Sequence, residues 1–162
     1  MAIKLIGIER INKALAISAK KADKLCMRGM IEASIVIRRD MKGKVPVDTR
    51  NLEASWFVVT ANSTKTAPTF DGEDAGKMMA DHSATIAENK GKVVATPMPS
   101  LIMGFSANYA AAVHEGKVTG KKEMDFHKKG KRPGAEAKFF ENALNRNKGT
   151  ILALTGQELS KL

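Results

Sequence analysis

Residues 101–116 read LIMGFSANYAAAVHEG and combine two different sequence patterns. Its first five residues form an apolar run between turn-forming residues, a pattern typical of a buried strand. Asn108 is a good helix N-cap, and the alanine-rich run after it predicts a short helix over residues 109–115. Gly116 can end that helix in a left-handed conformation. We therefore expect a strand that leads into a small helix, whose three alanines allow close approach to another backbone.

A long N-terminal helix is predicted within residues 1–44. Residues 3–41 contain no proline and only two glycines, and their apolar side chains recur at steps of three and four. A helix of about 35 residues spans roughly 50 Å, which exceeds the diameter of a domain of this size. We expect part of its apolar stripe to overhang and to need a partner chain. A break near Gly29, giving two ordinary helices, is the alternative.

Three more strands are predicted before residue 101. Residues 55–60 are rich in β-branched and aromatic side chains, and Trp56, the only tryptophan, is expected to anchor the core. Residues 82–88 and 92–96 flank an Asn-Lys-Gly turn signal, which predicts a β-hairpin. The sheet is therefore expected to hold about four strands, mostly antiparallel.

The C-terminal region predicts one helix over residues 133–161, packed on the sheet. Pro133 suits the first turn of a helix, and apolar residues follow at helical spacing, with an interruption near Gly149 left open. The predicted fold is α+β, in a single domain of 162 residues.

Two long predicted loops carry opposite charges. Residues 61–81, mostly the first loop, hold two lysines and four acids, whereas residues 116–132 hold seven Lys or Arg and two acids. Such loops suit head-to-tail association between copies of the chain. The alternative is that most lysines only solvate helix faces. The side chains predicted to form this interface are Phe70, Asp71, Glu73, Asp74, Lys121, Lys122, Lys128, Lys129, Lys131 and Arg132.

Composition predicts a soluble protein made in a cytoplasm. The single cysteine, Cys26, excludes an internal disulfide framework. No apolar run approaches the length of a membrane span, and the N-terminus has no signal-peptide core. The net charge of +10 leaves nucleic acid, anionic surfaces and acidic proteins open as partners.

The sequence indicates no catalytic residue, cofactor or metal site. Its three histidines are scattered, and His114-Glu115 is only the first pair of a zinc-protease pattern, because Val118 stands where the second histidine belongs. The basic segment 117–132 favours phosphate contact, so a non-specific DNA-binding accessory protein is the alternative function. No helix carries the polar face that base readout requires.

Three segments, in this order, resemble one family. They are VPVDTRNLEASW at residues 45–56, ANYAAAVHEG at residues 107–116 and RPGAEAKFFENAL at residues 132–144. The chain resembles the head–tail connection and tail-completion proteins of long-tailed bacteriophages, also described as minor tail or neck components. Where that family commonly reads Asp-Thr-Gly-Asn-Leu, this sequence has Arg50 in place of glycine, which questions a positive φ at that position.

The resemblance implies an antiparallel sheet packed against terminal helices, and a structural role without catalysis. It implies a homo-oligomeric ring, hexameric or dodecameric, at the neck or upper tail of the virion, assembled in the host cytoplasm. The implied partners are other copies and adjacent head-connector, terminator or tail-tube proteins, with non-specific contact to passing DNA and none to a membrane. The residues that carry the structural motifs are Asp48, Thr49, Asn51, Leu52, Trp56, Tyr109, His114, Glu115, Gly116 and Pro133.

Overall fold

The computed structural model describes residues 7–46, 50–116 and 133–162. In chain order its elements are α1 (Ile8–Lys42), α2 (Asn51–Ala54), β1 (Trp56–Thr60), β2 (Thr64–Thr66), α3 (Ala75–Ala95), β3 (Leu101–Phe105), α4 (Ala110–His114) and α5 (Phe139–Leu159). The expected α+β class is confirmed.

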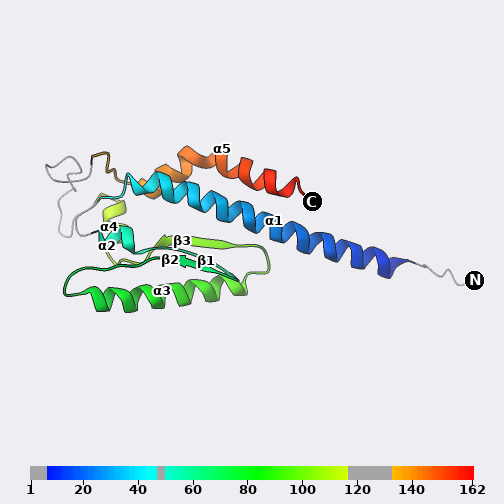
Figure 1. Ribbon diagram of the computed structural model, residues 1–162, viewed down its shortest axis with the longest axis horizontal. Coiled ribbons are helices and arrows are strands. Elements are labelled where there is room, and N and C mark those ends of the chain that lie inside the picture. The colour runs from blue at the N-terminus through cyan, green and yellow to red at the C-terminus, as the bar shows by residue number, and fades with distance from the viewer. Residues whose placement is uncertain (1–6, 47–49, 117–132) are drawn as a thin grey trace, which may run out of the picture.

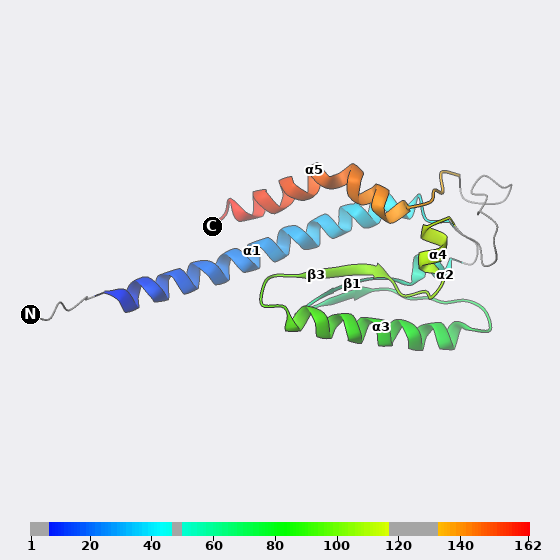
Figure 2. The same ribbon diagram turned by 180° about the vertical axis from the view of Figure 1, so that it is seen from behind.

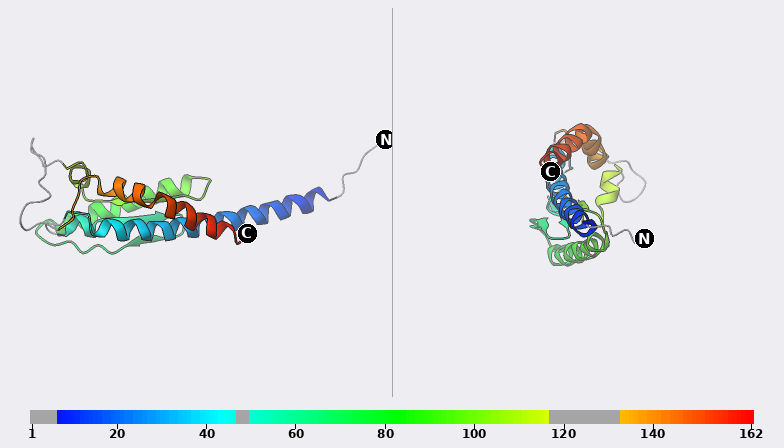
Figure 3. Two further views of the ribbon diagram at one scale, coloured as in Figure 1. Left: turned by 90° about the horizontal axis from the view of Figure 1, so that it is seen from above. Right: turned by 90° about the vertical axis from the view of Figure 1, so that its right-hand side faces the viewer.

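The elements lie in layers along the length of α1 (Figure 1). One face of the sheet contacts α1, and α3 lies against the other face. α5 runs antiparallel to α1 on the side away from the sheet, an order that is clearest when the molecule is viewed along its length (Figure 3). Seen from behind, the small helices α2 and α4 sit together at one end of the sheet (Figure 2).

The sheet has three strands in the order β2-β1-β3, with antiparallel pairing throughout. Trp56 pairs with Phe105 and Thr60 with Leu101, so β1 and β3 match along their whole length. All five residues of β1 are buried. This follows from its central position, because helices cover both faces of a sheet whose middle strand reads as a continuous apolar run.

α1 is one continuous helix of 35 residues, so the prediction of a long helix is confirmed and the break near Gly29 is wrong. Gly29 is buried, and a Cβ atom there would lie 2.6 Å from the Cα of Thr155 on α5. The glycine therefore permits close approach of the two helices and does not interrupt α1.

The hairpin predicted over residues 82–96 is wrong, because these residues belong to α3. α3 as a whole holds five alanines, three lysines, two methionines and one glutamate, all good helix formers, and this propensity outweighs the Asn-Lys-Gly turn signal. Gly91 is exposed within the helix, where a glycine costs only about 1 kcal/mol relative to alanine. The predicted loop 61–80 is likewise shorter, since β2 and the start of α3 lie within it.

The C-terminal helix differs from its prediction in its start and in its packing. Pro133 and Gly134 form a turn, and α5 begins at Phe139 and continues through Gly149. α5 packs against α1, not on the sheet. Its first residue still reaches the sheet, where the ring of Phe139 meets that of Phe105 edge-on with centroids 5.6 Å apart.

The core lies where α1, the sheet and the start of α5 converge. Its buried residues are Ile37, Met41, Val45, Leu52, Trp56, Val58, Ala107, Phe139 and Ala143. The predicted anchoring role of Trp56 is confirmed. α4 is a short helix with no fully buried residue, and Ala111 is exposed, so the expected close packing of its alanines is wrong at that position. Its N-cap is Tyr109, not Asn108.

Candidate assembly site

Residues 8–24 of α1, which we call the arm, form the start of the helix, and most of them project beyond the other described elements (Figures 1 and 3). α5 ends beside the base of the arm, where Lys21 Nζ donates a hydrogen bond to the carbonyl of Leu162 at 2.5 Å. Every arm residue except the half-buried Ala22 is exposed. The overhang expected from the length of the helix is therefore present.

One face of the arm is apolar. Ile8, Ile11 and Leu15 follow each other at steps of three and four, and the side chains of Ile11 and Leu15 are 61% and 62% exposed. The same face of α1 continues into Gly29 and Ala33, which are buried. The arm thus extends a stripe that is covered in the second half of the helix and uncovered in the first.

The opposite face of the arm is basic. Lys13 and Lys20 lie on it, with Ile17 between them at 61% exposure. Because a helix turns by about 100° per residue, Ile17 is half a turn away from Ile8. The arm holds five basic and two acidic side chains, a net charge of +3.

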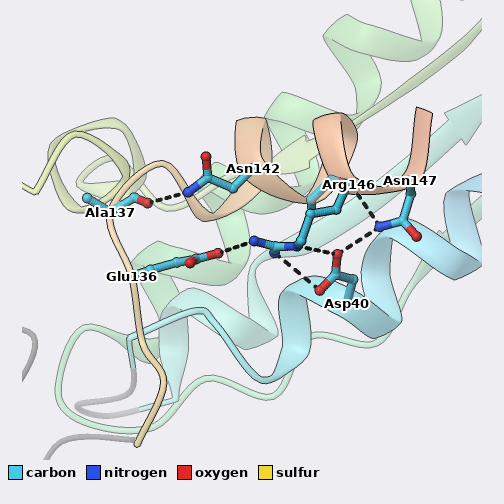
Figure 4. Close-up of polar contacts among 7 residues, drawn as sticks. Asp40, Glu136, Ala137, Asn142, Arg146 and Asn147 are labelled. Carbon is cyan, nitrogen blue, oxygen red and sulfur yellow. Dashed lines mark hydrogen bonds and ion pairs between the residues drawn. The ribbon is translucent and has the colours of Figure 1, made fainter. Parts of the chain in front are cut away.

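A cluster of charged and amide side chains around Arg146 fixes the covered half of α1 to α5 (Figure 4). The Arg146 guanidinium donates to both oxygens of Asp40, at 3.0 and 3.2 Å, and to Glu136 at 2.8 Å. Asn147 donates to Asp40 at 2.7 Å. The hydrogen bond from Arg146 lowers the pKa of Asp40, and the same contact raises the pKa of Arg146. The cluster holds α5 at one position along α1.

Nothing local in the sequence indicates this cluster. Arg146 and Asp40 lie on different helices and are 106 residues apart in the chain. The cluster could be predicted only if the antiparallel packing of the two helices were known, because that packing brings the end of α1 to the start of α5.

α4 and the start of α3 lie at the end of the molecule opposite the arm (Figure 1), and between them lies a hollow that we call the acidic groove. It is a hollow of about 150 Å³ between the start of α3 and the β3–α4 connection. The side chains that line it are Phe70, Asp74, Lys77, Met78, Asp81, Ser106, Ala107, Asn108 and Tyr109. Residues 71–81 hold four acids and one lysine, a net charge of −3.

The structure brings only part of the predicted interface together. Phe70 and Asp74 both line the acidic groove. Glu73 is exposed nearby, and Asp71 lines a different hollow with Arg50. The predicted basic side chains, from Lys121 to Arg132, lie outside the described residues.

Asn51 is the best-defined member of the predicted structural motif. Its side chain is buried and forms two hydrogen bonds to the backbone of Asp71, donating to the carbonyl and accepting from the amide, both at 2.9 Å. This pairing ties α2 to the segment that leads into α3. Asp48 and Thr49 lie outside the described residues, and Leu52 is buried in the core.

Arg50, at the start of α2, has a φ of 63° and is therefore left-handed. The replacement of glycine does not remove the positive φ that the resemblance implies at this position. An arginine in this conformation costs about 1–2 kcal/mol, so the surrounding contacts hold it there.

His82 is a residue of a type that is common in functional sites, and the prediction that places it on a strand is wrong. It is buried on α3, with Nε2 2.6 Å from Thr66 Oγ1 and Nδ1 2.6 Å from Ser106 Oγ. The rings of Phe57 and Phe70 meet it edge-on. Burial lowers the pKa of His82. The imidazole connects α3 to both edges of the sheet, and its neighbours Ser106 and Phe70 line the acidic groove.

The His114-Glu115 pair lies at the end of α4, where the helix predicted over residues 109–115 also ends. His114 Nδ1 lies 3.1 Å from a carboxylate oxygen of Glu115, and its ring meets Phe139 edge-on at 5.1 Å. Its carbonyl accepts a hydrogen bond from the amide of Lys138. Gly116 follows with a φ of 70°, the left-handed terminus expected for it. The pair therefore helps to connect α4 to the start of α5.

Within the described ranges, no group of three or more His, Cys, Asp or Glu side chains is placed to hold a metal ion. A search of the same residues finds no helix long and apolar enough to cross a membrane. Comparison of the chain with protein-family models, curated proteins and solved structures finds no match.

Proposed function

We propose that this chain is a structural component of a tailed-bacteriophage particle. In this proposal, copies of the chain form a ring at the neck or upper tail that helps to join head to tail. The proposal rests on the three sequence segments that resemble head–tail connection and tail-completion proteins, and on the surfaces that the fold presents for assembly.

The arm is the observation that carries the proposal. Burying apolar surface is worth roughly 25 cal/mol per Å², so isoleucine and leucine side chains aligned on one face favour a partner that covers them. Ile8, Ile11 and Leu15 have this arrangement, and the described residues of their own chain leave them exposed. A neighbouring subunit or an adjacent virion protein would cover this face.

The distribution of charge supports contacts between unlike surfaces. The arm is basic, and the groove at the other end of the molecule is acidic. A surface at one end that attracts a different surface at the other end gives heterologous contacts, which close into a ring when the rotation between copies permits. Two-fold dimers need a self-complementary patch instead.

The chain's presence and role in particles test the proposal. Mass spectrometry of purified particles of the phage that encodes the chain should detect it in several copies per particle. Disruption of its gene should leave filled heads and separate tails in electron micrographs, and supply of the wild-type chain from a plasmid should restore joined particles. Particles that lack the chain, or that join normally after disruption, contradict the proposal.

The alternative is a DNA-binding accessory protein, which the charge of one hollow favours. Arg38, Lys42 and Arg50 line a hollow of about 520 Å³, although Glu53 and Asp71 line it too. A salt titration of binding to unrelated duplexes separates the two functions. Steep salt-dependent binding by the isolated chain supports the alternative, because neutralised phosphates release counterions.

A further inference from the structure

On the basic face of the arm, two charged residues and an apolar residue follow a regular spacing. Another surface of the same chain has the same spacing with charges of opposite sign. On the arm, Lys13, Ile17 and Lys20 follow at i, i+4 and i+7. On α3, Asp74, Met78 and Asp81 follow at the same steps, with Asp74 as the N-cap of the helix. In each set the charged residues stand about 10.5 Å apart along the helix, with an apolar residue between them.

The charged members of both sets are exposed, whereas Met78 is half-buried and packs against the core. Lys13, Lys20, Asp74 and Asp81 are exposed, and Ile17 is 61% exposed. The arm and the start of α3 lie at opposite ends of the long axis (Figure 1), so one copy cannot bring its own arm to its own groove.

The hollow beside Met78 has the size for one aliphatic side chain. Its volume is about 150 Å³, and Phe70 and Tyr109 contribute apolar walls to it. Lys77 is the one cation among its lining residues, against the two carboxylates. An isoleucine flanked by lysines matches this hollow in both shape and charge. Docking of one arm against another arm would instead bring lysines against lysines.

We propose that the basic face of the arm of one copy docks against the acidic groove of the next copy. Ile17 enters the hollow beside Met78, and Lys13 and Lys20 pair with Asp74 and Asp81. The apolar face of the arm, with Ile8, Ile11 and Leu15, then points away from the groove and remains available to a further subunit. This inference rests on the proposed ring and names the two surfaces that form its repeating contact.

Paired charge reversals in the full-length chain test the docking. One variant carries K13E and K20E, and the other carries D74K and D81K. Sedimentation velocity over a range of concentrations measures self-association of each. We expect each variant to raise the dissociation constant about tenfold or more, since two attractive pairs become repulsive.

Recombining the reversals restores the complementary charges. A chain that carries all four substitutions should associate nearly as tightly as wild type, and so should an equimolar mixture of the two variants. The control is a K90E and K148E variant, which changes net charge as much as the arm variant does at exposed sites on α3 and α5. It should associate like wild type. Circular dichroism establishes that each variant is folded.

Each other outcome overturns the inference. If only the arm variant weakens association, the arm binds a different surface. If only the groove variant does so, another basic segment, such as residues 117–132, occupies the groove. Failure of the four-substitution chain to recover, or a wild-type chain that stays monomeric at every concentration, also overturns it. The proposed function is judged separately, by the presence of the chain in particles.

Discussion

The two halves of α1 share one helix and one apolar stripe but differ in what covers them. In residues 25–42 the stripe is buried under α5 and the sheet, and it includes Ile37 at 4% exposure. In the arm the stripe continues through Ile11 at 61% exposure. The apolar face that this periodicity creates therefore contributes to folding in one half of α1. In the other half it stays exposed and is available for contacts with another chain. Amphipathic spacing indicates that a face will be buried, and it does not say by which chain.

The largest expected effect is on the buried half of the stripe. The substitution Ile37→Ala should lower the free energy of unfolding by about 2–5 kcal/mol, because it removes a core side chain and leaves a cavity. Ile11→Ala, on the apolar face of the arm, should change it by less than about 0.5 kcal/mol. Urea denaturation of the monomeric chain measures both. Equal losses would show that the arm is already covered within one chain.

The second prediction concerns the close approach that holds the covered half. Gly29→Ala should cost about 1–3 kcal/mol, since the new Cβ would stand 2.6 Å from the backbone of Thr155. Gly149→Ala is the control on α5, where a Cβ would meet no atom within 4 Å, and it should stabilise the chain by up to about 1 kcal/mol. Thermal unfolding followed by circular dichroism compares them. A neutral Gly29→Ala variant would argue against the tight α1–α5 contact.

The third prediction concerns the cluster around Arg146. Arg146→Gln should lower the free energy of unfolding by about 1 kcal/mol, a modest value because the arginine side chain is 41% exposed and solvent screens its ion pairs. Lys148→Gln, at an exposed position on the same helix, is the matched control and should be nearly neutral. Hydrogen exchange of the backbone amides at the end of α1 should also be faster in Arg146→Gln than in the wild-type chain. Unchanged exchange there would mean that the apolar contacts alone hold α5.

The smallest expected effect is a dependence of the free energy of unfolding on pH, which arises at α3, away from the arm. Burial lowers the pKa of His82, so the unfolded chain takes up a proton more readily than the folded chain does. Stability should therefore decline as the pH falls below the ordinary histidine pKa of about 6.5, and it should stop declining once the folded imidazole is also protonated. Urea midpoints between roughly pH 7.5 and 5 measure this slope. The slope should be shallower in His82→Gln, which cannot take up the proton, and an identical slope would assign the effect to other groups.

The parts of the fold that the sequence predicts correctly depend on patterns repeated over many residues or concentrated in a short apolar run. α1 is an example of the first, and β1 and β3 of the second. The apolar pattern does not indicate α3, because its buried side chains are only His82 and Val93, which leaves little apolar periodicity over 21 residues. The local turn signal at Gly91 favours a hairpin there, whereas helix propensity summed over the whole segment favours a helix.

The partners of each element were harder to predict than the elements themselves. The spacing of α5 indicates a buried face, but its contact with α1 depends on Gly29 and Thr155, which are far apart in the chain. The pairing of Asn51 with the backbone of Asp71 joins two motifs that were assigned separately, one as structural and one as an interface. Of the side chains predicted for the interface, Phe70 and Asp74 line one groove, because both lie close to the start of the same helix.

The register between α1 and α5 also determines a length. Gly29 faces Thr155, and Asp40 binds Arg146, so the end of α5 falls beside Lys21. Residues 8–20 then extend past it by about 20 Å, at 1.5 Å per residue. A slip of α5 by a single helical turn would lengthen or shorten this reach by about 5.4 Å. The buried glycine and the Arg146 cluster thus determine how far the arm extends beyond the rest of the chain.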